Sequence, residues 1–86
     1  MALLRVYALL REKLGWSSKT LALGREARLR DVLESVDELK PLVSLFESGE
    51  LIVLVNGVNA RLLQGLDTPV RDEDVLDIFP PGGGGL

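Results

Sequence analysis

The chain has 86 residues, of which 47% are hydrophobic and 27% are charged, and its net charge is −3. This length and composition indicate one compact domain, and no apolar run approaches the roughly 20 residues that span a bilayer. The sequence has no cysteine and no histidine, which excludes thiolate nucleophiles and removes the commonest general base and metal ligand. The acidic balance argues against a nucleic-acid partner. We therefore expect a cytoplasmic, non-catalytic domain without a metal site that binds neither nucleic acid nor membrane.

Residues 3–10 (LLRVYALL) form an apolar run that predicts a strand through the core. Strand alternation puts Leu4, Val6 and Ala8 on one face and Arg5 and Tyr7 on the other. Residues 11–15 predict a turn, and residues 19–23 (KTLAL) predict a short second strand. The two strands are close enough in sequence to pair as a hairpin with a long connection.

The clearest helical signal begins at Leu29. The apolar residues at i, i+3, i+4 and i+7 are Leu29, Val32, Leu33 and Val36. No good N-cap residue precedes this segment, so the pattern defines the helix face better than the helix start. Pro41 disfavours continuation of the helix because proline lacks a backbone N–H donor, and residues 42–46 predict a second short helical turn.

Residues 51–55 (LIVLV) form a continuous apolar run, which is typical of a strand buried on both faces. The Asn56-Gly57 pair tolerates positive φ and is the strongest short-range signal for a hairpin. We therefore expect residues 58–63 to return as a short partner strand. Residues 66–70 contain a proline and predict a loop or a brief edge segment.

The last strand is predicted at residues 75–79, after the acidic turn Asp72-Glu73-Asp74. Its alternation puts Leu76 and Ile78 on one face and Val75, Asp77 and Phe79 on the other. We interpret the acidic turn as solvated side chains and not as a metal or acid–base site. Strands that flank one strong helix predict an α+β domain with a single mixed sheet and one main helix packed across it.

The composition changes abruptly after the last predicted strand. Two prolines and four glycines follow it, namely Pro80, Pro81, Gly82, Gly83, Gly84 and Gly85. The prolines stop the strand and favour an extended exit, and glycines cannot bury apolar side-chain area. Fully extended, residues 80–85 would reach about 20 Å. We therefore divide the chain into a domain of residues 1–79 and a flexible tail of residues 80–86, which could carry a terminal carboxylate into a partner's active site.

Residues 72–81 (DEDVLDIFPP), followed by glycines, resemble the C-terminus of the small subunit of molybdopterin synthase (MoaD) of the MoaD/ThiS sulfur-carrier family. Residues 6–8 (VYA) and 10–12 (LRE) are similar to the first strand of that family and the Arg-Glu pair after it. Residues 52–57 are similar to its central strand and Asn turn. The resemblance covers nearly the whole chain and implies a β-grasp, ubiquitin-like fold.

The resemblance also implies a function. In that family an ATP-dependent, E1-like activating enzyme adenylates the terminal glycine, which is then converted to a thiocarboxylate. The large subunit of molybdopterin synthase uses this sulfur to build the dithiolene of molybdopterin. The last two family glycines fall on Gly84 and Gly85. The chain is therefore expected to be a carrier subunit that binds no cofactor itself, while the activating enzyme uses ATP.

One feature departs from the family pattern. Family members usually end at the second glycine, whereas this sequence continues to Leu86. An activating enzyme that requires a glycine carboxylate could use Gly85 only after Leu86 is removed. Three alternatives therefore stay open: a sulfur carrier for thiamin thiazole synthesis, a ubiquitin-like protein modifier that forms isopeptide bonds with lysines, and a β-grasp interaction module with an inert tail.

A partner-binding patch is also expected beside the tail. Val75 and Phe79 share the strand face opposite Leu76 and Ile78, and an aromatic residue leading into a docking tail indicates a recognition surface. The competing interpretation is that Phe79 caps the edge of the core. The resemblance extends the expected contact surface along Pro80, Pro81, Gly82 and Gly83.

Overall fold

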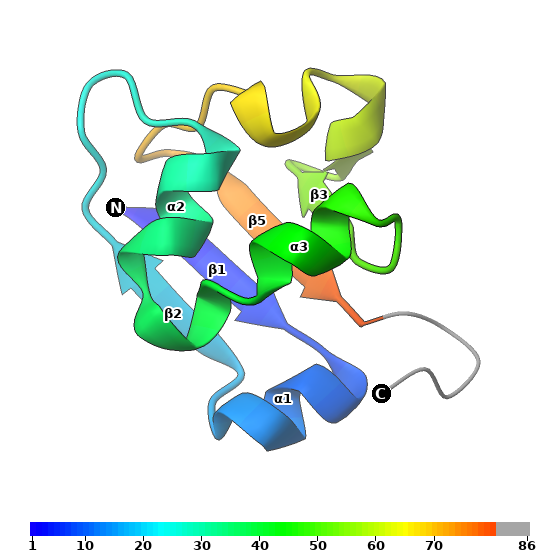
Figure 1. Cartoon of the computed structure of the whole chain (residues 1–86). Helices are drawn as coiled ribbons and strands as arrows, with labels where there is room; N and C mark the ends of the chain where they lie inside the picture. Colours follow the sequence, from blue (N-terminus) through cyan, green and yellow to red (C-terminus); the bar gives the residue numbers. More distant parts are fainter. Residues whose placement is uncertain (81–86) are drawn as a thin grey trace.

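The computed structural model describes residues 1–80 and gives an α+β domain. In chain order its elements are β1 (Ala2–Val6), α1 (Ala8–Leu14), β2 (Ser18–Leu21), α2 (Leu29–Ser35), the 3-10 helix η1 (Asp37–Leu39), α3 (Leu42–Glu47), β3 (Ile52–Val55), β4 (Val58–Asn59), the 3-10 helices η2 (Ala60–Leu62) and η3 (Gly65–Asp67), and β5 (Val75–Phe79). The strands within the described residues form one mixed sheet in the order β2-β1-β5-β3-β4 (Figure 1). The central pair, β1 and β5, is parallel, and the other pairs are antiparallel. This topology is the β-grasp fold, as expected.

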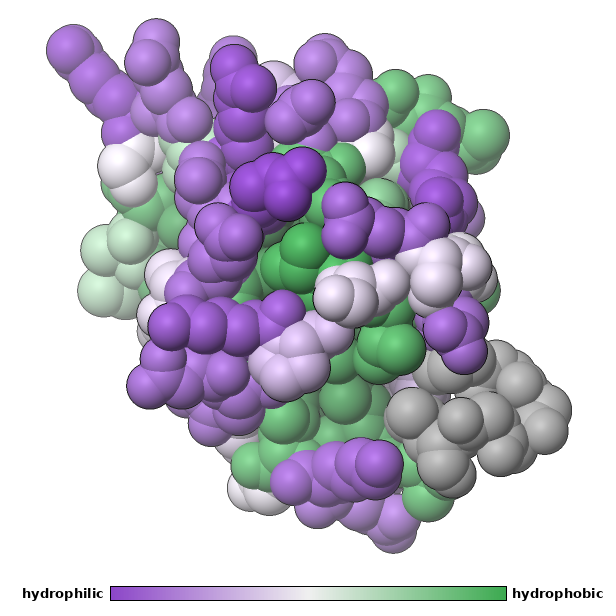
Figure 2. Space-filling model, viewed as in Figure 1, coloured by the Kyte–Doolittle hydropathy of each residue, from purple (hydrophilic) through white to green (hydrophobic). Residues whose placement is uncertain are grey.

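The hydrophobic core lies between the sheet and the helices α2 and α3, which cross one of its faces (Figure 1). We call this covered face the inner face and the opposite one the outer face. On the inner face Leu4, Val53, Leu76 and Ile78 are each 0% exposed. The helices contribute Leu29, Val32, Leu33, Leu42 and Phe46 to the same cluster. Figure 2 shows the solvent side of this helical layer as mostly polar, with apolar surface in the centre and towards α1.

The strand predicted at residues 3–10 is wrong in its second half. β1 ends at Val6, and the segment predicted to be strand and then turn is the helix α1. Its sequence, ALLREKL, consists of good helix formers. A helix also lets Leu10 and Leu14, four residues apart, face the core together. Ala8 is consequently exposed and does not lie on the inner face.

The end of α1 explains why residues 11–15 resemble a turn. Gly15 adopts φ 82° and its N–H donates to the Arg11 carbonyl at 3.0 Å, which forms a left-handed C-cap. Only glycine enters this conformation without a steric cost from a Cβ atom. β2 then begins one residue earlier than predicted and ends at Leu21.

The predicted helix face at residues 29–36 is confirmed, since Leu29, Val32 and Leu33 lie fully inside the core. The start of this helix is fixed by a capping hydrogen bond to a side chain within its first turn, which the residue type at the N-cap position does not indicate. The Arg28 N–H donates to Oδ2 of Asp31, the third residue of the helix, at 2.9 Å. The helix α2 ends at Ser35, and η1 and α3 follow it in the layer that covers the sheet. The single main helix that was expected is therefore a run of short helices.

The strand predicted at residues 51–55 exists as β3, but it is not buried on both faces. Val53 and Val55 face the core, whereas Ile52 is 44% exposed on the outer face. The Asn56-Gly57 hairpin is confirmed, with φ values of 51° and 84°. The returning strand β4 is only two residues long, because the chain bends into η2 at Ala60, which is fully buried.

The loop predicted at residues 66–70 overlaps η3 and a single bridge between Pro69 and Arg28. The predicted last strand has the residue range of β5, and its two faces are assigned correctly. No helix among residues 1–80 is both long enough and apolar enough to span a membrane.

Candidate functional site

β5 leads into the C-terminal tail at one end of the sheet. β1 and β5 run in the same direction, towards the side of the molecule where α1 lies (Figure 1). The Tyr7 ring, just beyond the end of β1, stacks on the Phe79 ring with centroids 4.4 Å apart and planes 8° from parallel. Pro80 follows and is half-buried. We call Tyr7, Phe79 and Pro80 the tail base.

The two residues predicted as a patch lie at opposite ends of β5. Phe79 pairs with Ile52 on β3, whereas Val75 pairs with Leu3 on β1. Four residue steps of strand separate them by about 13 Å. They share the outer face, as predicted, but Asp77 stands between them, so their side chains do not form one continuous apolar patch.

Phe79 does not belong to the buried core cluster. It is half-buried and packs against Tyr7 on the outer face, on the side of the sheet away from Leu76 and Ile78. The interpretation that Phe79 caps the core edge is therefore wrong. Its alternative, that Phe79 contacts a partner, stays a prediction.

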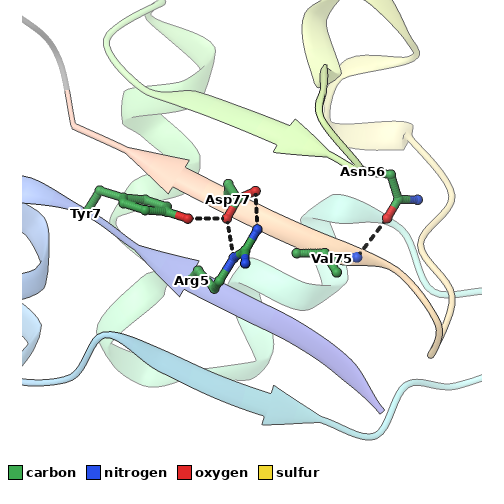
Figure 3. Close-up of polar contacts among 5 residues, drawn as sticks. All are labelled: Arg5, Tyr7, Asn56, Val75 and Asp77. Carbon is green, nitrogen blue, oxygen red and sulfur yellow. Dashed lines mark hydrogen bonds and ion pairs between the residues drawn. The ribbon is translucent and has the colours of Figure 1, made fainter.

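A polar network occupies the centre of the outer face (Figure 3). Arg5 Nε and Nη2 donate to the two carboxylate oxygens of Asp77 at 2.7 and 3.1 Å. The Tyr7 hydroxyl donates to Asp77 Oδ1 at 2.7 Å. Arg5 and Asp77 are direct neighbours in the parallel register of β1 and β5, which is why the fork of the guanidinium meets the carboxylate. The Asp77 side chain is only 11% exposed, compared with 46% for Arg5.

These contacts shift the protonation equilibria in the directions expected for paired groups. The Arg5 guanidinium, with help from the Tyr7 hydroxyl, holds the pKa of Asp77 below its usual value despite the opposing effect of burial. The hydrogen bond to Asp77 raises the pKa of Tyr7, because removing the phenolic proton would destroy it. The same carboxylate raises the pKa of Arg5. At neutral pH the network therefore consists of a carboxylate, a guanidinium and a neutral phenol.

Sequence reasoning placed Arg5, Tyr7 and Asp77 on strand faces but assigned none of them to a site. The available signal was a charge at the outer position of each of two strands. It could be used only with the parallel pairing of β1 and β5, which joins residues 72 positions apart.

Asp72 and Glu73 of the acidic turn are exposed, as predicted, whereas Asp74 is half-buried. Asp72 and Asp74 also hold the loop together. Asp72 Oδ1 accepts from the Leu23 N–H at 2.9 Å, and Asp74 accepts from the Arg71 N–H at 2.8 Å and from Asn56 Nδ2 at 2.9 Å. Among residues 1–80 no group of acidic side chains is arranged to hold a metal ion.

Five predicted site residues lie outside the described residues, and so does Leu86. They are Pro81, Gly82, Gly83, Gly84 and Gly85.

A β-grasp sheet whose last strand leads into a Pro-Pro-Gly segment defines a ubiquitin-like carrier or modifier domain. The model of the ThiS family matches residues 4–85, and the chain belongs to that family. The family comprises ubiquitin-like sulfur carriers and modifiers, which generally have no catalytic activity of their own.

Individual relatives and structures agree with this assignment. Small archaeal modifier protein 3 of Haloferax volcanii is 36% identical, over 95% of this chain and 96% of its own. The solution structure of small archaeal modifier protein 1 from Methanosarcina acetivorans has a TM-score of 0.75 at 31% identity, covering 98% of this chain and 95% of that one. A BexX/CysO complex from Amycolatopsis orientalis contains a chain with a TM-score of 0.74 at 25% identity, covering 99% of this chain and 100% of that one. These similarities confirm the β-grasp, ubiquitin-like fold.

Proposed function

We propose that this protein carries sulfur as a thiocarboxylate on its C-terminal glycine and delivers it to the large subunit of molybdopterin synthase. The observation that supports the proposal is the position of the tail base. β5 ends at Phe79, directly before Pro80, at one end of the sheet and beside an outer face that neither α2 nor α3 covers. A glycine segment leaving from this point would reach into an active site while the outer face rests on the partner.

The chemistry requires little from the chain itself. A carboxylate oxygen of Gly85 attacks the α-phosphorus of ATP in an E1-like activating enzyme and releases pyrophosphate. A persulfide held by a partner then attacks the acyl carbon and expels AMP, which forms an acyl disulfide. A thiol of a partner cleaves the S–S bond of this adduct, so that the thiocarboxylate is released and a disulfide stays on the partners. The sequence contains neither histidine nor cysteine, so we assign the base, the nucleotide site and the sulfur donor to the partners. Gly84 and the preceding glycines would fit a channel too narrow for side chains.

We assign partner contact to the outer face around the tail base. Ile52 is 44% exposed and pairs directly with the half-buried Phe79, so the two present adjoining apolar surface beside Pro80. Val75 lies farther along the same face, at the opposite end of β5. A few aromatic anchors dominate the binding energy of many protein interfaces, so we assign the larger contribution to the aromatic residues of the tail base. The chain of the BexX/CysO complex shows that a fold of this type occurs in an assembly with another protein.

A second candidate function is protein modification. The relatives at 36% and 31% identity bear the name small archaeal modifier protein, which favours a glycine that is joined to lysine amines of target proteins. Both functions begin with the same adenylate and differ in the nucleophile that attacks it. We keep the sulfur carrier as the first candidate because the segment from the acidic turn to the prolines resembles molybdopterin synthase small subunits.

The test compares three forms of the chain with the cognate activating enzyme: one ending at Gly85, one ending at Leu86, and one ending at residue 85 with Gly85→Ala. Only the first should form the adenylate and, with a sulfur donor, gain the mass of sulfur in place of oxygen. The Gly85→Ala form should unfold at the same denaturant concentration as the first, because the altered residue comes after β5 in the sequence and belongs to none of the strands and helices that build the core. Equal modification of all three forms would exclude the proposed mechanism.

Mass spectrometry of the protein from its native cells separates the two candidate functions. A thiocarboxylate without lysine adducts supports the carrier, and adducts between the terminal glycine and target lysines support the modifier. A chain that still ends at Leu86 and carries neither change would contradict both.

A further inference from the structure

Tyr7 belongs both to the polar network of the outer face and to the tail base. Its hydroxyl donates to Asp77 at 2.7 Å, and its ring stacks on Phe79 at 4.4 Å. Phe79 is the last residue of β5 and directly precedes Pro80. Tyr7 therefore connects a fixed carboxylate to the point from which the tail departs.

Asp77 is a rigid anchor for this connection. It accepts two hydrogen bonds from Arg5 in addition to the one from Tyr7, and its side chain is 11% exposed. The backbones of Arg5 and Asp77 are already locked in register within the central strand pair. The acceptor of the Tyr7 hydroxyl is thus fixed within the sheet. The Tyr7 side chain is held by this hydrogen bond and by the stack of its ring on Phe79.

The backbone around Tyr7 provides an independent observation. Tyr7 keeps an extended conformation, with φ −132° and ψ 160°, although β1 has ended. The next residue, Ala8, adopts φ 55°, a left-handed conformation that an alanine rarely enters. The chain thus reverses into α1 immediately after Tyr7, and the strain falls on Ala8. Such strain persists where the surrounding structure requires a particular chain path, which here is the turn between Tyr7 and α1.

We propose that Tyr7 is a positioning residue for the C-terminal tail. Together with Asp77 and Arg5 it holds Phe79 and Pro80 in one orientation and so fixes the direction in which the tail leaves the sheet. The effect on activity rests on the proposed function, because it matters only if the tail must enter a partner's active site. A tail that starts from a fixed point loses less conformational entropy when it reaches the reactive geometry.

The first experiment needs no partner. Nuclear magnetic resonance on the wild type should show contacts between the Tyr7 and Phe79 rings and a Phe79 amide order parameter near the rigid value of about 0.85. Tyr7→Leu removes both the stack and the hydroxyl and should lower that order parameter. Tyr7→Phe keeps the ring and should have an intermediate effect, which also covers the case in which Tyr7→Leu fails to fold.

Asn56→Ala is the matched control. Asn56 Oδ1 accepts from the Val75 N–H at 2.9 Å, so this variant disturbs β5 at its opposite end (Figure 3). It should leave Phe79 as ordered as in the wild type. If Phe79 is equally ordered in the wild type and in both Tyr7 variants, the positioning role is excluded.

The second experiment measures single-turnover adenylation of the chain ending at Gly85 by its activating enzyme. Tyr7→Leu should lower the rate at saturating concentration by about tenfold or more, since small misplacements of a reacting group are costly. The KM should change by less than about threefold, because the docking contacts remain. Tyr7→Phe should recover part of the rate, and Asn56→Ala should match the wild type.

A rise in KM at an unchanged saturating rate would make Tyr7 a docking contact and overturn the proposal. If the wild-type chain is not adenylated at all, the proposed function fails. The resonance measurements then still decide whether Tyr7 orders the tail base, so the two failures are distinguishable.

Discussion

The two faces of the central strands differ in almost every physical property, although their residues alternate along the same backbone. On the inner face Leu4, Leu76 and Ile78 are completely buried and purely apolar. One position away on the outer face, Arg5 and Asp77 form a hydrogen-bonded ion pair. The contrast shows that strand alternation separates the residues that make the domain fold from those available for recognition.

The two faces also stabilise the protein through different forces. The inner face acts through removal of apolar area from water, which is non-directional and depends little on pH. The outer face depends on donor and acceptor geometry and on the protonation of two of its members. A change on the inner face should therefore register as a loss of stability at every pH, whereas a change in the outer-face network should register mainly at intermediate pH and fade towards both extremes of pH.

The largest effect is expected from Leu76→Ala on the inner face. Leu76 is 0% exposed, so truncation leaves a cavity and should cost about 2–5 kcal/mol of unfolding free energy. Phe79→Ala, on the outer face of the same strand, should cost less than half as much, because Phe79 lies outside the core cluster. Urea denaturation of both variants is the measurement. Equal losses would contradict the distinction between the two faces.

Asp77→Asn should have the next largest effect, about 1–3 kcal/mol at neutral pH, since charge-assisted hydrogen bonds are lost. The folded pKa of Asp77 lies below the ordinary value of 3.8, so the unfolded chain takes up this proton first as pH falls. The stabilisation is therefore complete above about pH 5 and is lost as pH drops through the folded pKa. The difference in stability between wild type and Asp77→Asn should shrink as pH falls below about 5. A difference that is independent of pH would exclude this linkage.

Tyr7→Phe should act at the opposite end of the pH scale. The hydrogen bond to Asp77 raises the pKa of Tyr7 above its ordinary value of 10.0. Its contribution is thus fully present below pH 10 and is lost as pH rises through the folded pKa. Thermal unfolding at neutral and alkaline pH should show a difference between wild type and variant that declines above pH 10. Tyr7→Phe keeps the ring that stacks on Phe79, so the difference between wild type and variant reports the hydroxyl alone.

The smallest effect is expected from Ile52→Thr on the outer face of β3. Ile52 is 44% exposed, so the unfolding free energy should change by no more than about 0.5 kcal/mol. Val53→Thr is the matched control, because Val53 is 0% exposed on the inner face. The hydroxyl of the introduced threonine would be buried, which should lower the unfolding free energy by about 1–3 kcal/mol. Indistinguishable denaturation midpoints for the two variants would contradict the assignment of faces.

Much of the fold could be predicted because its signals are local. The apolar spacing from Leu29 to Val36 locates the helix face, and the Asn56-Gly57 pair locates a turn in which both residues have positive φ. The prediction failed where a continuous apolar run could adopt more than one structure. Residues 3–10 and residues 51–55 contain too little polar contrast to mark the end of β1 or the exposed side of β3.

The candidate site was predicted only in outline. Phe79 and Val75 were placed on the correct face together with Asp77, but they lie at opposite ends of β5 and do not form the single patch that was predicted. The partners of Asp77 are more than 60 residues away in the chain, so no local pattern joins them.

The sequence by itself determined the domain class, the main helix face, the hairpin turn and the glycine segment, because propensity, periodicity and turn chemistry act over a few neighbouring residues. Only the tertiary structure decided that β1 lies parallel to β5, that Arg5 meets Asp77, and that Tyr7 stacks on Phe79. Burial restricts how the central strands can pair, since a register slip of one residue would turn Leu4, or Leu76 and Ile78, away from the helices. The inner face therefore fixes the register, and the register brings the outer-face residues together.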